Sequence, residues 1–115
     1  MRYRMEAYPY EPGAVRIVAR DFVAIVPREV AARFDELARR ARPRGSWQLK
    51  ILLELARYGR VAAKAAHWVR GRAASYELHY QRSLDGLMER LGEQYVQYVP
   101  HRGRRAAYYE LREGE

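Results

Sequence analysis

The last third of the chain places the tightest limits on the fold. An amphipathic segment, 73–91, carries apolar and Tyr side chains at helical spacing and leads through Gly92 into two runs with strand character. These runs, 95–99 and 106–111, flank the basic sequence His101-Arg-Gly-Arg-Arg. A glycine-containing turn between two aromatic runs is typical of a β-hairpin. The sequence therefore predicts a long helix followed by a hairpin with a positively charged tip.

The predicted helix has one apolar face and one polar face. The side chains that anchor it to a core are Tyr76, Tyr80, Leu84, Leu87, Met88 and Leu91. Along the outward face, the N-terminal half carries Ser75, His79, Gln81 and Arg82, and the C-terminal half carries Asp85, Glu89 and Arg90. Gly86 can kink or end the helix, because glycine costs roughly 1 kcal/mol relative to alanine. The change from basic to acidic suits a helix whose N-terminal half meets a nucleic acid.

Two breaks that contain Pro and Gly divide the rest of the chain. The first, 9–13, precedes a β-branched apolar run, 15–26, which predicts a hairpin or a pair of strands. Arg20-Asp21 within this run marks either a second tight turn or a bend in one strand. Pro27 then stands where a helix can begin, and 28–42 is predicted as an amphipathic helix. Its apolar stripe consists of Val30, Phe34, Leu37, Ala38 and Ala41.

The second break, Arg42-Pro-Arg-Gly45, makes Ser46 a candidate N-cap for a helix over 47–58. That helix is apolar nearly all round, so it needs cover on two sides. We expect the later helices on one side and the N-terminal strands and helix on the other. The sequence thus predicts a single domain over 1–115, in which an extension, 1–45, packs on a core, 46–115.

Gly59 ends this helix, and the spacing of Val61, Ala65, Trp68 and Val69 predicts a short helix over 61–70. Gly71 supplies the next turn. The short helix exposes Lys64, His67 and Arg70, which suit contacts with a nucleic-acid backbone, and its N-terminus near Arg60 can accept a phosphate oxygen.

Charge and composition favour a polyanionic partner. The net charge is +8, from 22 Lys and Arg against 14 Asp and Glu, and only two of those 22 are lysines. Guanidinium groups form paired hydrogen bonds with phosphates and with guanine edges. A GC-rich genome or a thermophilic source also favours Arg over Lys. Cysteine is absent, no apolar run approaches the roughly 20 residues of a membrane span, and the N-terminus is charged. We expect a soluble cytoplasmic protein, associated with the nucleoid if it binds DNA.

From 46 to 111 the chain resembles the winged helix-turn-helix superfamily, on its helix order, its Leu91-Gly exit and its basic hairpin; no subfamily is matched. The resemblance implies an α+β fold: three helices plus a C-terminal β-hairpin, here preceded by N-terminal strands and an amphipathic helix. It also implies binding of duplex DNA, with the long helix in the major groove and the hairpin, the wing, at the flanking backbone or minor groove. The candidate nucleic-acid-binding residues are Arg60, Lys64, His67, Arg70, Arg72, Ser75, His79, Gln81, Arg82, Arg102, Arg104 and Arg105.

Other functions remain open. An Arg-rich domain with ten tyrosines also suits structured RNA in a ribonucleoprotein, and winged helices also serve as protein-interaction modules. Tyr98 or Tyr108 can stack on single-stranded bases or pack across the hairpin, and we favour packing. The stripe around Phe34 packs either within the chain or against a second copy in a homodimer.

Catalysis, metal binding and a cofactor are not expected. The three histidines, His67, His79 and His101, lack the short spacing and partner ligands of a zinc site. Asp35 and Glu36 point in different directions on a helix, and no glycine-rich phosphate cradle is present.

Overall fold

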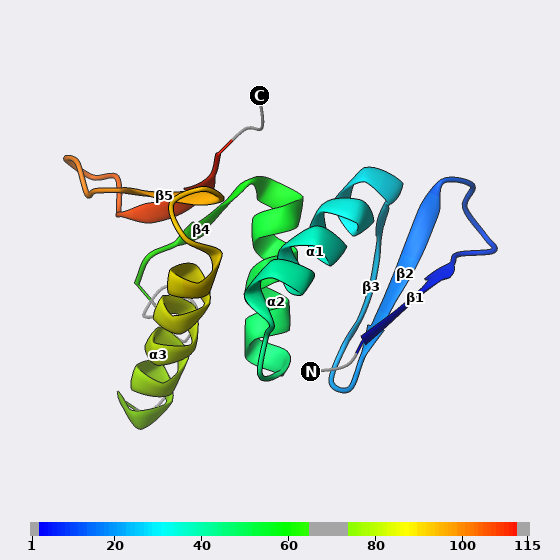
Figure 1. Ribbon diagram of the computed structural model, residues 1–115, viewed down its shortest axis with the longest axis horizontal. Coiled ribbons are helices and arrows are strands. Elements are labelled where there is room, and N and C mark those ends of the chain that lie inside the picture. The colour runs from blue at the N-terminus through cyan, green and yellow to red at the C-terminus, as the bar shows by residue number, and fades with distance from the viewer. Residues whose placement is uncertain (1–2, 65–73, 113–115) are drawn as a thin grey trace.

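The computed structural model describes residues 3–64 and 74–112, apart from the side chains of 74–76 (Figure 1). It is an α+β fold in which two small antiparallel sheets accompany the helices. The elements are β1 Tyr3–Ala7, β2 Ala14–Ala19, β3 Val23–Pro27, α1 Arg28–Ala41, α2 Ser46–Tyr58, β4 Arg60–Ala62, α3 Ala74–Leu91, β5 Val96–Val99 and β6 Tyr108–Leu111. The sheet β1-β2-β3 lies at one end, α3 and the hairpin lie at the other, and α1 and α2 lie between (Figure 1).

The N-terminal sheet is an antiparallel meander. Met5 pairs with Ile17, which pairs with Ala24, so the Arg20-Asp21 alternative is resolved as a turn between two strands. The Tyr3 ring meets the Phe34 ring edge-on at 5.1 Å between centroids, and its hydroxyl donates a 2.6 Å hydrogen bond to Asp35. Burial raises the pKa of Tyr3 above its usual range, and the hydrogen bond to Asp35 is the second largest cause of this rise. These contacts fix the sheet to α1.

Helix α1 begins directly after Pro27, as predicted, and ends at Ala41, where Arg42 takes a left-handed conformation with φ 51°. Its apolar stripe is buried within the chain, with Phe34 fully buried and Leu37 only 2 % exposed. These members of the stripe therefore pack within the chain, while Val30 is only partly buried. Phe34 and Leu37 leave almost no apolar area for a second copy.

Helix α2 begins one residue earlier than predicted, and Ser46 is not its N-cap. Gly45 occupies the cap position in extended conformation, while the Ser46 hydroxyl donates to a carboxylate oxygen of Asp21 at 2.6 Å. The turn between β2 and β3 thus removes the hydroxyl from capping. The predicted cover by helices on two sides is confirmed, because α2 packs against both α1 and α3 and buries Leu49, Ile51, Leu52, Leu53 and Leu55. The N-terminal sheet, expected to share this cover, packs on α1 instead.

The helix predicted over 61–70 is wrong at its start, where the chain forms strand β4 instead. Val61 is buried and pairs with Tyr109 of β6. The amide of Leu111 donates to the Gly59 carbonyl, so pairing with β6 satisfies the extended backbone. The rest of this predicted helix, with Trp68, lies outside the described residues.

Helix α3 continues through Gly86 to Leu91, so it does not end early at this glycine. Its predicted core face is confirmed for the five members whose side chains are described: Tyr80, Leu84, Leu87, Met88 and Leu91. The helix ends at Gly92, whose φ of 78° allows the chain to turn into β5. Strands β5 and β6 form the predicted hairpin, and β4 adds to its β6 side to give the order β4-β6-β5. We call this hairpin the wing.

Candidate nucleic-acid interface

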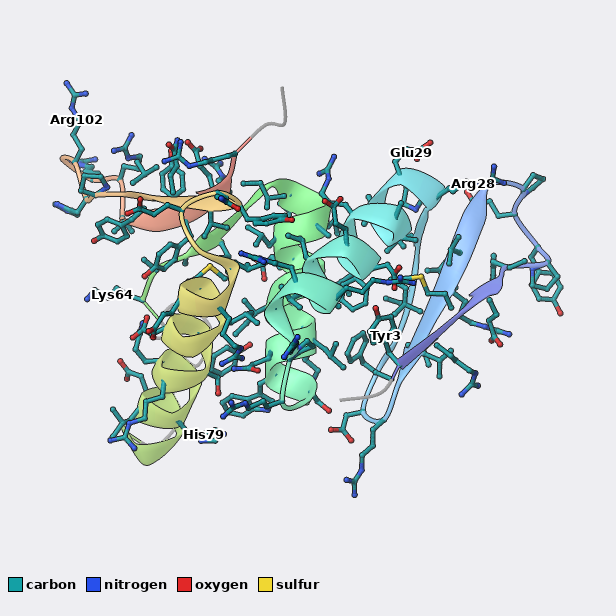
Figure 2. The ribbon with its side chains drawn as sticks, viewed as in Figure 1. Tyr3, Arg28, Glu29, Lys64, His79 and Arg102 are labelled. Atoms are coloured by element: carbon teal, nitrogen blue, oxygen red, sulfur yellow. The ribbon has the colours of Figure 1, made fainter. Side chains whose placement is uncertain are left out.

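The candidate residues that the structure describes lie at the end of the molecule away from the N-terminal sheet. Figure 2 shows Arg102 at the tip of the wing, Lys64 below it and His79 on the N-terminal part of α3. Arg28 and Glu29, on α1, lie toward the opposite end. The order of the elements thus brings parts of the chain that are far apart in sequence to one end of the molecule.

The wing tip is a tight turn crowded with positive charge. Arg102 and Arg105 face each other across it, with N–H to carbonyl distances of 3.0 and 2.9 Å, and Gly103 takes a φ of 58°. The side chains of Arg102, Arg104 and Arg105 are exposed. Over the ranges 3–64 and 74–112, none of the three forms an ion pair. A bound anion would relieve their mutual repulsion, because like charges on one turn raise the local potential.

Arg60 belongs to the wing and not to a helix N-terminus, where the sequence placed it. Pairing of β4 with β6 brings its guanidinium over the Tyr108 ring, 5.4 Å from the centroid. The Arg105 guanidinium lies 5.5 Å from the same ring. Both contacts are of the cation–π kind, which holds the two guanidinium groups close to one aromatic side chain. Arg60 therefore adds a fourth positive charge near the base of the tip.

The wing tyrosines pack across strands, as favoured from the sequence. Tyr98 is the register partner of Tyr109, and their rings meet edge-on at 5.5 Å between centroids. Tyr98 is nevertheless 54 % exposed. Its free surface faces the hollow between the wing and α3.

That hollow, which we call the wing-side hollow, is lined by Lys64, Glu77, Leu78, Asp85, Tyr98 and Tyr109 among others. It contains two acids against one lysine. Burial, followed by the charge of Asp85, raises the pKa of the Tyr109 hydroxyl. A phosphate is disfavoured here, because carboxylates repel it.

Gln81, a candidate binding residue, makes two hydrogen bonds within the chain. Its amide donates to the Ala63 carbonyl and to Asp85, both at 2.9 Å. The first bond ties α3 to the residue that follows β4. Gln81 therefore helps to hold α3 beside the wing sheet.

On the other flank of α3 lies a second hollow, which we call the helix-start hollow because α2 begins at its edge. Its lining includes Arg44, Trp47, Gln48, His79, Arg82 and Arg90. The His79 ring lies against the Trp47 ring at 5.3 Å between centroids, and Arg82 is exposed. Three guanidinium groups and an imidazole thus surround one depression in the surface.

Arg90 was predicted to point outward, but it folds back toward α1. Its Nε donates to the Ala41 carbonyl at 2.6 Å and its Nη2 to the Gln48 side-chain oxygen at 2.8 Å. Gln48, only 7 % exposed, also accepts from the Arg44 amide at 2.7 Å and donates to the Ser83 carbonyl at 3.0 Å. This single buried amide joins the α1–α2 turn to α3.

For four of the remaining candidate residues, the structure does not describe the side chain. His67, Arg70 and Arg72 lie outside the described residues, and Ser75 is on α3 with its side chain undescribed. Sequence reasoning missed Arg44 and the inward course of Arg90. The available signal was Gln48, a polar residue within an otherwise apolar helix, which is a common mark of a buried hydrogen-bond centre.

The described residues contain no group of three or more His, Asp or Glu placed to hold a metal ion. None of the helices in the described ranges is long and apolar enough to cross a membrane. Comparisons with protein-family models, with curated proteins and with solved structures found no match.

Proposed function

We propose that this protein binds nucleic acid, with duplex DNA as its partner, and that 46–111 acts as a winged helix. The observation that carries the proposal is the wing tip, where Arg102, Arg104 and Arg105 crowd a turn without an ion pair to any described residue. Such a cluster suits the phosphates of a duplex, because each contact releases condensed counterions. Support also comes from the β4-β6-β5 sheet, which anchors the wing beside α3.

In the proposed complex, α3 approaches the duplex while the wing contacts the flanking backbone. His79 and Arg82 lie on the N-terminal part of α3, and both are exposed. The acids Glu77 and Asp85 lie on the flank of α3 that faces the wing. We therefore expect α3 to turn its His79–Arg82 side toward the phosphates.

The test replaces Arg102, Arg104 and Arg105 by Ala and measures duplex affinity over a salt series. The slope of log affinity against log salt should shrink by roughly one for each lost phosphate contact. The matched control is the triple variant Arg4→Ala, Arg20→Ala and Arg28→Ala, which removes the same charge from the N-terminal end and should retain the slope. If both variants behave alike, the wing has no part in binding. Competition with structured RNA at matched salt decides the partner, and a clear preference for RNA overturns the DNA assignment.

A second candidate, a protein-interaction module, is favoured by the wing-side hollow. Leu78 is 52 % exposed there beside the half-exposed Tyr98, and Glu77 and Asp85 supply negative charge. Apolar side chains with acids around them suit a basic peptide. This candidate predicts no duplex binding at about 0.15 M salt, so measurable binding under that condition argues against it.

A further inference from the structure

We propose that the helix-start hollow is an oxyanion site that holds a backbone phosphate of the nucleic acid. This inference rests on the proposed function and adds a second point of contact to the wing. The two contacts differ in construction, because the wing tip is an exposed turn while the hollow is a recess between two helices. The site would take a phosphate group and not a base.

Positively charged side chains from two segments converge on the helix-start hollow without paired acids. Arg44 comes from the α1–α2 turn, and His79, Arg82 and Arg90 come from α3. No carboxylate belongs to the lining, and the ion pairs in the described part of the chain involve other arginines: Arg4 and Arg16 with Glu6, and Arg39 with Asp35. One acid, Asp21, adjoins the lining, because its carboxylate accepts a hydrogen bond from the Ser46 hydroxyl. Three guanidinium groups around a recess are therefore short of negative charge, and a phosphate supplies it.

Arg90 is held in position by the protein itself, without a ligand. Its two hydrogen bonds go to neutral oxygens of Ala41 and Gln48, which fix the guanidinium but leave its positive charge unneutralised. A methyl group at Gly86 would lie 3.4 Å from Arg90 Nη1, so this nitrogen rests close to the bare backbone of α3. A guanidinium that is already ordered loses little side-chain entropy on binding an anion.

The start of α2 adds to the same field. The N-cap residue of α2 is Gly45, which makes no side-chain cap hydrogen bond. The first-turn amides of this helix carry partial positive charge that favours an anion. The arginine cluster carries the inference, and the helix start strengthens it.

The site changes the assignment of His79 and Arg82. From the sequence they were candidate nucleic-acid-binding residues on a helix expected in the major groove, where side chains can read bases, whereas in the hollow they share a recess with Arg44 and Arg90. A phosphate contact carries no sequence information, so replacing Arg82 should weaken binding to all duplexes alike. A base contact would instead change the preference between duplexes.

The experiment compares Arg44→Gln/Arg82→Gln with the control Arg20→Gln/Arg28→Gln, all four being exposed arginines of the full chain. Fluorescence anisotropy with two duplexes of different sequence is recorded from about 50 to 200 mM salt. We expect the first double variant to lose at least tenfold in affinity, to reduce the salt slope by about two and to keep the ratio between the duplexes. Affinity equal to that of the control, or a changed ratio, overturns the inference.

A titration with inorganic phosphate, followed by amide NMR, separates this inference from the proposed function. Saturable shifts at residues 44–47 in the wild type, lost in the Arg44→Gln/Arg82→Gln variant and kept in the wing variant, support the oxyanion site. Duplex DNA should displace the phosphate from it. If the wild type shows these phosphate-induced shifts but does not bind duplex DNA, the proposed function is refuted, and the phosphate of this site does not come from a nucleic acid. Absence of localised shifts refutes the site itself, even if the wing binds DNA.

Discussion

The two hollows beside α3 are built from one helix and carry opposite charge. His79, Arg82 and Arg90 face the helix-start hollow, whereas Glu77 and Asp85 face the wing-side hollow. His79 and Arg82 are three residues apart, and Arg82 and Arg90, like Glu77 and Asp85, are eight apart, so each set lies on one side of the helix. The sequence suggested that charge changes along the length of α3, basic early and acidic late. The structure shows that it changes around the circumference, so the orientation of the helix about its own axis decides what it can bind.

The strongest way to break this comparison is Gln48→Leu. The variant leaves the Arg44 amide, the Ser83 carbonyl and Arg90 Nη2 without their partner, so we expect a loss of about 3 kcal/mol in the free energy of unfolding. Urea denaturation measures it. The exposed Gln94→Leu serves as control and should stay within about 0.5 kcal/mol of the wild type. An equally small change at Gln48 would show that this amide does not organise the helix-start hollow.

Reversing the charge of the acidic flank sharpens the comparison next. Glu77→Lys with Asp85→Lys should raise duplex affinity roughly tenfold at about 0.1 M salt. The double variant removes two negative charges that repel the DNA phosphates and adds two positive charges that attract them. Anisotropy measures the gain. Glu29→Lys with Glu36→Lys makes the same change in net charge on exposed α1 positions. If this control gains as much, the wing-side hollow lies away from the duplex.

Tyr108→Leu tests the aromatic and guanidinium cluster of the wing, which belongs to neither flank of α3. The change removes the ring beneath the Arg60 and Arg105 guanidinium groups and should cost about 1 kcal/mol of stability. Chemical denaturation gives this value, with the 83 % exposed Tyr10→Leu as control. A Tyr108 effect no larger than that of Tyr10 would mean that the two cation–π contacts contribute nothing.

The smallest expected effect concerns Gly86→Ala. The new methyl group meets only Arg90 Nη1 at 3.4 Å, so the helix should gain about 0.5 kcal/mol, measured by thermal unfolding. Duplex affinity should fall a few-fold, because the methyl group narrows the recess. Gly92→Ala, at a φ of 78°, should instead lower stability. If Gly86→Ala raises stability and leaves affinity unchanged, no phosphate approaches this part of α3.

Sequence reasoning succeeded where a pattern is local and long. The apolar faces of α1 and α3 repeat over several turns, and the hairpin has a glycine at its tip, so neighbouring residues carried the signal. Strand β4 was missed because three residues hold no periodicity of their own and their partner, β6, comes far later in the chain. Tertiary pairing decided that segment.

The candidate site was predicted in part for a similar reason. The wing arginines lie within four consecutive positions, so the sequence alone singled them out as candidates. Arg90 occupies an outward position on a helical wheel, yet its long side chain reaches back to Ala41 and Gln48. Arg44 joins the same hollow only because the α1–α2 turn places it there. A wheel describes where a side chain leaves its helix and not where its charged end arrives.

The pairing of β4 with β6 also bears on the order of assembly. Val18 pairs with Val23 across a short turn, whereas Val61 pairs with Tyr109 about 50 residues later, which requires closing a much longer loop. The N-terminal meander and the β5–β6 hairpin, in which Val99 pairs with Tyr108, can therefore form early, while the pairing of β4 with β6 must wait for the longer loop to close. In pulsed hydrogen exchange, the amides of β2 and β3 should gain protection before those of β4. Arg60, on β4, would then reach its place over the Tyr108 ring later than the arginines of the wing tip.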